Sequence, residues 1–127
     1  MSDHPLKLDH IGLRVTNLEK SVHFYTAALG PLGMSLIGKS DSHAAFGIGS
    51  MPYLTIRLTD KVEGPTHVAF LAESYEQVDI FHQAGISTGG TDGGAPGLRP
   101  DYHENYYGAF VLDPDGHNIE LVKHSPA

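Results

Sequence analysis

The chain repeats one sequence pattern, and this repetition limits its fold more than any other feature. Residues 9–15 (DHIGLRV) resemble residues 66–72 (THVAFLA), and the same spacing carries Phe24 onto Phe81. Two copies of about 60 residues each are too few for a solenoid, in which several repeats stack. We therefore expect two similar modules within one fold.

The hydrophobic pattern predicts the same order of elements in each module, namely a strand, a helix and three more strands. Alternating apolar residues predict strands, and apolar residues at helical spacing predict helices after residues 17 and 74. The predicted class is α+β: two βαβββ modules, residues 6–59 and 66–123, forming a curved mixed sheet (a cup) with the helices on its outer face. Together they make a single domain over residues 1–127. The expected strands cover residues 6–16, 34–39, 43–48, 53–59, 66–72, 106–112 and 118–123.

Capping residues mark where each helix should begin. Thr16 and Glu19 form a capping-box pattern for the first helix, with Asn17 as an alternative cap. Ser74 and Gln77 suggest another capping box for the second helix.

The stretch from Gly89 to Gly108 differs from the rest of the chain. It is rich in glycine and continues into LRPDYHENYYG, so we expect a long loop of the kind that often carries function. Its glycines match neither G-x-G-x-x-G nor G-x-x-x-x-G-K, and no nucleotide site is predicted.

Charge and composition disfavour several classes of protein. With 15 acidic and 8 basic residues the net charge is −7, and no basic cluster occurs, so we expect binding to neither nucleic acid nor an anionic membrane. No apolar run approaches the roughly 20 residues of a membrane span, and the first residues lack the layout of a signal peptide. The chain has no cysteine, which fits a cytoplasmic protein and leaves imidazole and carboxylate as the metal ligands.

His10 and His67 occupy equivalent places in the two modules. Each should point away from the bulky apolar residues of its strand, and Glu120, between Ile119 and Leu121, should do the same in the last strand. In a curved sheet the three side chains could converge. Two imidazoles and a carboxylate form a facial triad that leaves about three positions open on an octahedral ion. We therefore predict one divalent metal ion (Fe, Mn, Co, Ni or Zn) bound by His10, His67 and Glu120.

The other histidines are expected to have ordinary roles. His23 and His82 should be solvated on the helices, and His117 should complete the turn formed by residues 113–116 (DPDG). His4, His43 and His124 lie near a terminus or a turn.

Three segments resemble the vicinal oxygen chelate superfamily, which includes glyoxalase I, extradiol dioxygenases and bleomycin- and fosfomycin-resistance proteins. The segments are LDHIGLRVTNLEKSVHFYTAALGPLGM, THVAFLAES and AFVLDPDGHNIELV, and with the repeat they cover nearly the whole chain. The resemblance implies paired βαβββ modules around a metal ion, with His10, His67 and Glu120 at the ligand positions. It also implies a homodimer, because family members often pair modules between two chains.

One position departs from glyoxalase I, which resembles this pattern but uses a fourth ligand, a carboxylate in its fourth strand. The internal repeat puts Thr55 or Arg57 at that place, and neither is a carboxylate. Three ligands are instead similar to the extradiol dioxygenases and the fosfomycin-resistance transferases. Arg57 is a candidate for binding an anionic group of the substrate.

The long loop supplies the candidate acid–base residues. They are Arg99, Tyr102, His103, Tyr106 and Tyr107, because a tyrosine or histidine near the metal ion can pass a proton to the substrate. Of the adjacent pair Tyr106 and Tyr107, one should face the cup and the other the helix layer.

The leading hypothesis is a metal-dependent enzyme that binds a small substrate through two neighbouring oxygens. It would act as a glyoxalase-like lyase or isomerase, or as an extradiol-type dioxygenase. The alternative is a non-catalytic protein that binds a drug-like molecule, similar to the bleomycin-resistance members. A thiol transferase of the fosfomycin-resistance kind needs a cationic site, which the low count of lysine and arginine disfavours.

Overall fold

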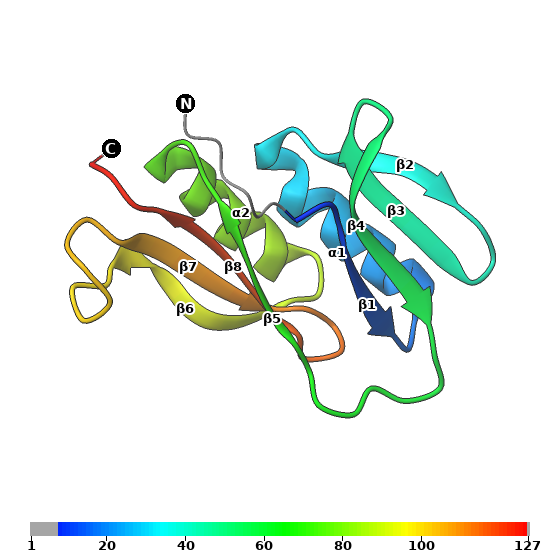
Figure 1. Cartoon of the computed structure of the whole chain (residues 1–127). Coiled ribbons are helices and arrows are strands. Elements are labelled where there is room, and N and C mark those ends of the chain that lie inside the picture. The colour runs from blue at the N-terminus through cyan, green and yellow to red at the C-terminus, as the bar shows by residue number, and fades with distance from the viewer. Residues whose placement is uncertain (1–7, 127) are drawn as a thin grey trace.

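The computed structural model describes residues 8–126 and contains two modules of the expected kind (Figure 1). Within residues 8–126, no helix is long and apolar enough to cross a bilayer. The first module consists of β1 (Ile11–Val15), α1 (Leu18–Leu29), a short 3-10 helix η1 (Gly30–Leu32), β2 (Ser35–Lys39), β3 (His43–Ile48) and β4 (Met51–Leu58). The second consists of β5 (His67–Leu71), α2 (Tyr75–Ser87), β6 (Thr91–Leu98), β7 (Tyr107–Leu112) and β8 (Asn118–Lys123).

The two modules share one sheet topology. The strand orders are β1-β4-β3-β2 and β5-β8-β7-β6. The pairs β1–β4 and β5–β8 are parallel, and all the other neighbouring pairs are antiparallel. The predicted α+β class and βαβββ order are thus confirmed. The described chain forms two separate four-stranded sheets, since β1 and β5 belong to different sheets.

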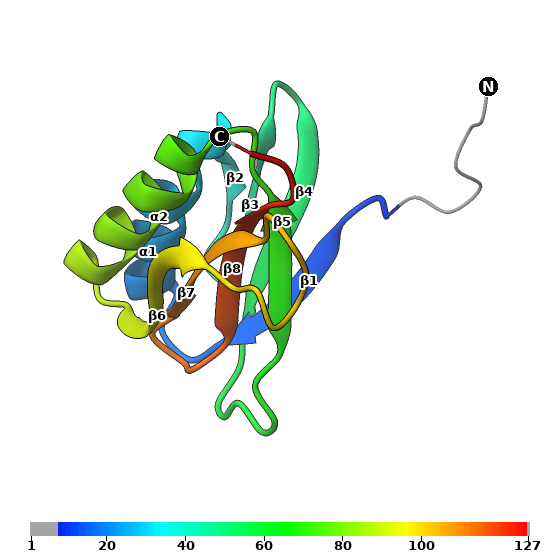
Figure 2. The same cartoon turned by 90° about the vertical axis from the view of Figure 1, so that its left-hand side faces the viewer.

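Both helices cover the same side of the two sheets, and α1 packs against α2 (Figure 2). This contact gives the modules a common core. At Gly90, a Cβ atom would lie 2.5 Å from Val111 Cγ1 and 2.6 Å from Phe24 Cε1, so only glycine lets the chain after α2 approach α1 so closely. The opposite face of each sheet carries no helix, and we call these two surfaces the open faces.

The helices begin at capped residues, though not all as expected. Asn17 caps α1, because its side chain accepts a hydrogen bond from the backbone N–H of Lys20 at 3.0 Å. Thr16, the other candidate, instead donates its hydroxyl and its backbone N–H to Asp115. Ser74 caps α2 by accepting from the N–H of Gln77, as predicted.

The turn at residues 113–117 joins the two modules, and we call it the joining turn. The Tyr25 hydroxyl donates to Asp113 at 2.5 Å, and Asp115 accepts from Thr16. His117, which is buried, accepts from the N–H of Thr66 through Nδ1 at 2.9 Å and donates through Nε2 to the carbonyl of Arg14 at 2.7 Å. Module 2 is therefore fixed to both β1 and α1 of module 1.

The expected loop over residues 89–108 is only partly a loop. Its first half forms β6, which pairs with β7 and shifts register between Asp92 and Gly94 and again between Gly94 and Gly97. The sequence-based expectation was wrong here, because the run TDGGAPGL lacks the β-branched and aromatic residues that indicate a strand.

Candidate metal and substrate site

A histidine and a carboxylate meet on the open face of module 2. His67 Nε2 lies 2.9 Å from Glu120 Oε1, and the exposed fractions of the two side chains are 54% and 2%. Asn118 pairs with His67 in the ladder, and its buried Oδ1 has no hydrogen-bond partner within residues 8–126. An accessible imidazole, a buried carboxylate and an unused acceptor are thus gathered at one point.

Tyr106 covers the second oxygen of this carboxylate. Its hydroxyl donates a hydrogen bond to Glu120 Oε2. Burial raises the pKa of Tyr106 above its ordinary value, the bond to Glu120 raises it further, and the positive charge of Arg99 opposes the rise. The hydroxyl is therefore protonated at neutral pH and is held beside Glu120.

Three aromatic rings surround the ring of Tyr106. Tyr102, His103 and His124 meet it edge to face, at centroid distances of 4.8, 5.2 and 5.4 Å. His103 and His124 also stack on each other, with His103 Nε2 2.8 Å from His124 Nδ1. Sequence reasoning did not single out His124, which lies just beyond β8 and meets this cluster only through the fold.

His10 lies immediately before β1 and is accessible. Its Nδ1 is 2.7 Å from Asp9 Oδ1, and the exposed fraction of its side chain is 55%. The contact with Asp9 leaves Nε2 of His10 free, as is usual for a histidine that binds a metal through one nitrogen while the other is held. Asp9, the residue directly before His10 in the sequence, was not among the predicted site residues.

Within one chain, the structure brings together two of the three predicted ligands. His67 and Glu120 are in contact, whereas His10 precedes β1 of the other module and lines a hollow beside Ala69–Leu71. In the part of the chain that the structure describes, no group of three His, Cys, Asp or Glu side chains is close enough to hold a metal ion.

The ladders identify the residue of module 1 that corresponds to Glu120. Glu120 pairs with Ala69, two residues after His67, and Thr55 pairs with Gly12, two residues after His10. Thr55 therefore takes the place of Glu120, and Arg57 lies two residues further along the same face. A threonine hydroxyl is not a carboxylate, so module 1 offers His10 without an acidic neighbour at that place.

Arg57 belongs to a cationic row on the open face of module 1. It pairs with Arg14 on one side and with His43 on the other, and all three side chains are exposed. Neither arginine has a carboxylate within 4.0 Å among residues 8–126. Adjacent like charges on a sheet are unfavourable unless an anion joins them.

Tyr107 points to the helix side of the sheet, away from Tyr106. Its ring stacks on Tyr75 of α2 with the centroids 3.8 Å apart, and its hydroxyl donates to Asp79 at 2.6 Å. These contacts give Tyr107 a place in the packing between β7 and α2.

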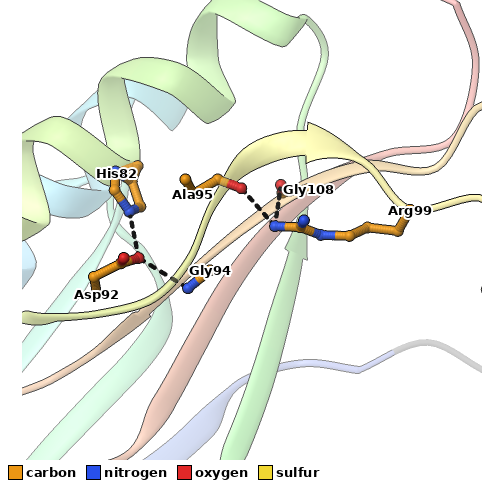
Figure 3. A network of polar contacts seen from close by, with 6 residues as sticks. All are labelled: His82, Asp92, Gly94, Ala95, Arg99 and Gly108. Carbon is orange, nitrogen blue, oxygen red and sulfur yellow. Dashed lines mark hydrogen bonds and ion pairs between the residues drawn. The ribbon is translucent and has the colours of Figure 1, made fainter.

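Arg99 lies over the open face of module 2. Its guanidinium carbon is 5.5 Å from the ring centroid of Phe110, and Nη2 donates to the carbonyls of Ala95 and Gly108 (Figure 3). Phe110 pairs with Glu120, so Arg99, Phe110 and Glu120 share one face.

His82, expected to be solvated, is instead largely covered. Its Nε2 lies 2.9 Å from Asp92 Oδ1, and its side chain is 17% exposed (Figure 3). The bond from His82, and the backbone N–H of Gly94 on the same carboxylate, lower the pKa of Asp92. The contact holds β6 against α2.

An apolar hollow of about 340 Å³ lies between β1 and β5. Ile48, Tyr53, Phe70 and Leu71 line it, and His10 stands at its edge. A volume of this size holds a small organic molecule.

Comparison with known proteins gives consistent relatives. The family model described as "Glyoxalase/Bleomycin resistance protein/Dioxygenase superfamily" matches residues 7–121. A Vibrio cholerae protein named "Probable lactoylglutathione lyase" is 32% identical over an alignment that covers 100% of this chain and 96% of the relative.

Solved structures lead to the same group. A glyoxalase/bleomycin resistance protein from Albidiferax ferrireducens superposes with a TM-score of 0.78 at 30% identity, covering 93% of this chain and 98% of the other. A glyoxalase I mutant from Zea mays has a TM-score of 0.70 at 28% identity, and the match covers 98% of this chain but 49% of that protein.

Proposed function

The chain belongs to the glyoxalase/bleomycin resistance protein/dioxygenase superfamily, also called the vicinal oxygen chelate superfamily, and on this premise we propose that it is a metal-dependent enzyme. The substrate is a small molecule that binds through two neighbouring oxygens. The reaction is a lyase or isomerase step of the glyoxalase kind.

The contact between His67 and Glu120 is the observation that carries this proposal. Glu120 is almost fully buried, yet its oxygens meet an accessible imidazole and a tyrosine hydroxyl on a face that no helix covers. A buried carboxylate is costly unless it is paired or binds a cation. The donors fit a divalent ion of the Fe, Mn, Co, Ni or Zn type, which would act as a Lewis acid on the two substrate oxygens.

We propose that His10 completes the ligand set from a second copy of the chain in a homodimer. One chain keeps His10 apart from His67 and Glu120, and each module leaves one open face. An open face of module 1 placed against module 2 of a second copy would let His10 Nε2 approach Glu120. A two-fold dimer would then contain two such sites.

In this site Tyr106 is the proposed acid–base residue. Its hydroxyl is protonated and donates a hydrogen bond to Glu120, and that position suits donation of a proton to a substrate held nearby. Tyr102 and His103 contact the ring of Tyr106, and the cationic row of Arg14 and Arg57 is one candidate place for an anionic group of the substrate.

Counting bound metal in two variants tests both the site and its division between chains. Wild-type protein loaded with Zn²⁺ or Co²⁺ should retain one ion per chain, and H10A and E120A should each retain none. An equimolar mixture of the two variants, unfolded and refolded together, should regain roughly a quarter of the sites, because half of the dimers are mixed and each mixed dimer has one intact site. H23A, which removes a histidine of α1, is the control.

Two outcomes would overturn the proposal. Wild-type protein without a stoichiometric ion removes the metal site. A mixture that regains no site, together with a monomer by light scattering, removes the shared arrangement.

The reaction is tested by two assays on the loaded protein. Formation of lactoylglutathione from methylglyoxal and glutathione would support the reaction for which the curated relatives are named. Oxygen uptake with catechol by protein loaded with Fe²⁺ would instead favour an extradiol-type dioxygenase, a second candidate that the non-acidic Thr55 supports.

The alternative is a non-catalytic protein that binds a drug-like molecule, and the apolar hollow beside His10 favours it. Binding of an aromatic ligand that is equally tight with and without a chelator, in a protein inactive in both assays, would support this alternative over an enzyme.

A further inference from the structure

The glycine-rich strand β6 and the arginine that follows it have no role in the site described so far. The Arg99 side chain folds back across β6 toward the carbonyls of Ala95 and Gly108 (Figure 3). Its guanidinium carbon lies 5.5 Å from the ring centroid of Phe110. Both of its hydrogen bonds, to Ala95 O at 2.5 Å and to Gly108 O at 3.3 Å, are made by Nη2.

The guanidinium keeps most of its donors for something else. Arginine has five N–H groups, and within residues 8–126 neither Nε nor Nη1 of Arg99 has a hydrogen-bond partner. No carboxylate of the described chain lies within 4.0 Å of Arg99, and nearby Asp92 is bound by His82 and by Gly94. Arg99 is thus a positioned and unpaired cation in a chain of net charge −7.

Glycine is what makes room for this cation. A Cβ atom at Gly94 would lie 2.9 Å from Phe110 Cδ1 and 3.2 Å from Arg99 Nη2, so a larger residue would displace the guanidinium from the ring. The same glycines that make β6 hard to predict from the sequence therefore leave room for the guanidinium of Arg99 above Phe110.

Arg99 is also close to Glu120, because both lie against Gly108. The carbonyl of Gly108 accepts from Arg99 Nη2, and a Cβ atom on Gly108 would lie 3.5 Å from Glu120 Oε2. These two distances, together with the size of the Gly108 backbone, put the guanidinium of Arg99 within roughly 10 Å of the Glu120 carboxylate. In module 1, Arg14 is farther from the candidate metal ligand His10, about 13 Å along the strand direction.

We propose that Arg99 binds a carboxylate of the substrate, and that the substrate is a short acid whose carboxylate lies only a few bonds from its two chelating oxygens. This inference rests on the proposed function for the position of the chelating oxygens. A free guanidinium edge binds a carboxylate through two parallel hydrogen bonds, which also fixes the orientation of the molecule. Malate, with a hydroxyl beside one carboxylate and a second carboxylate one carbon further, has the required shape.

The chain contains only three arginines, Arg14, Arg57 and Arg99, so the Nε–H signals of ¹⁵N-arginine-labelled protein give a direct test. Each signal is assigned from the variant that lacks it. Malate added to metal-free protein should shift the Arg99 signal and leave those of Arg14 and Arg57 in place. Movement of Arg14 and Arg57 with Arg99 unmoved, or equal movement of all three, would overturn the proposal.

Zn²⁺-loaded protein provides the second measurement, by calorimetry. R99Q should weaken malate binding about tenfold or more while changing the affinity for lactate, which lacks the second carboxylate, by less than twofold. R99K keeps the charge without the fork and should lie between R99Q and wild type, and K20Q removes a charge from α1 as the matched control. Equal weakening of malate and lactate would overturn the anchoring role. If wild-type protein binds no metal ion, the proposed function fails while the shift of the Arg99 signal still decides the anion site.

Discussion

Two neighbouring tyrosines meet two different carboxylates on opposite sides of one sheet. Tyr106 donates to Glu120 on the open face, and Tyr107 donates to Asp79 of α2 on the helix side. At the scale of single residues, a shift of one position in the chain thus moves a side chain from the candidate site to the packing against α2.

Tyr107 is expected to resist ionisation. Its hydrogen bond to Asp79, together with burial and the charge of Asp79, raises its pKa to about 12 from an ordinary value of 10.0. The unfolded chain loses this proton near pH 10, whereas the folded chain retains it. The stability that the protonated hydroxyl contributes is therefore full below pH 10 and is lost as the pH rises from 10 to about 12. In an alkaline titration followed at 295 nm, Y107F should lack an absorbance step near pH 12.

A missing step near pH 10 instead would show that Tyr107 is not held by Asp79. At neutral pH, Y107F should lose about 1 kcal/mol of unfolding free energy with the hydrogen bond. Y53F removes a hydroxyl that has no hydrogen-bond partner in the described chain, and it serves as the control.

The alternation of each strand predicted which residues share a face, but in the strand that follows Tyr106 it did not say which of the two tyrosines lies on the open face. Either Tyr106 or Tyr107 could face the site until the pairing of Phe110 with Glu120 fixed the register. Likewise the sequence left Thr55 and Arg57 as alternatives, and only the pairing of Gly12 with Thr55 distinguishes them. Register depends on contacts between distant strands, which local periodicity does not contain.

At the scale of elements, the joining turn links the modules through hydrogen bonds. His117 is buried and satisfies one backbone group of the segment before β5 and one of β1. H117A would leave the N–H of Thr66 and the carbonyl of Arg14 without partners, at a cost of about 3 kcal/mol. Urea unfolding should show this loss as a lower midpoint, and H23A on α1 should change the midpoint little. If the free energy of unfolding of H117A falls by less than about 1 kcal/mol relative to wild type, the proposed role of the turn is contradicted.

Elements with a strong hydrophobic period were predicted well, and β6 was not. Helix α1 and strands β5, β7 and β8 lie close to their expected ranges, because apolar residues recur on one side of each. Strand β6 forms because β7 supplies its hydrogen-bond partners, with two shifts of register along the pair. The covered position of His82 was missed for the same reason, since its partner Asp92 lies on β6.

At the scale of the whole molecule, the repeat predicted two modules but not how they sit together. Packing of α1 on α2, with Phe24 against Gly90, sets the angle between the sheets and keeps His10 away from Glu120. The identities of His10, His67 and Glu120 do not determine that angle. The sequence therefore predicts His10, His67 and Glu120 as candidate ligands but contains no prediction of how the two modules place them in space.

The joining turn has a consequence for the continuity of the chain. Its hydrogen bonds, and the packing of Phe24 on Val111, connect the modules without any use of the covalent linker at residues 60–65. Two fragments, residues 1–62 and 63–127, should therefore assemble when they are co-expressed, and a purification tag on either should recover both. Recovery of the tagged fragment alone would contradict this. If the fragments do assemble, the two halves of this protein can be supplied, exchanged and recombined as separate polypeptides.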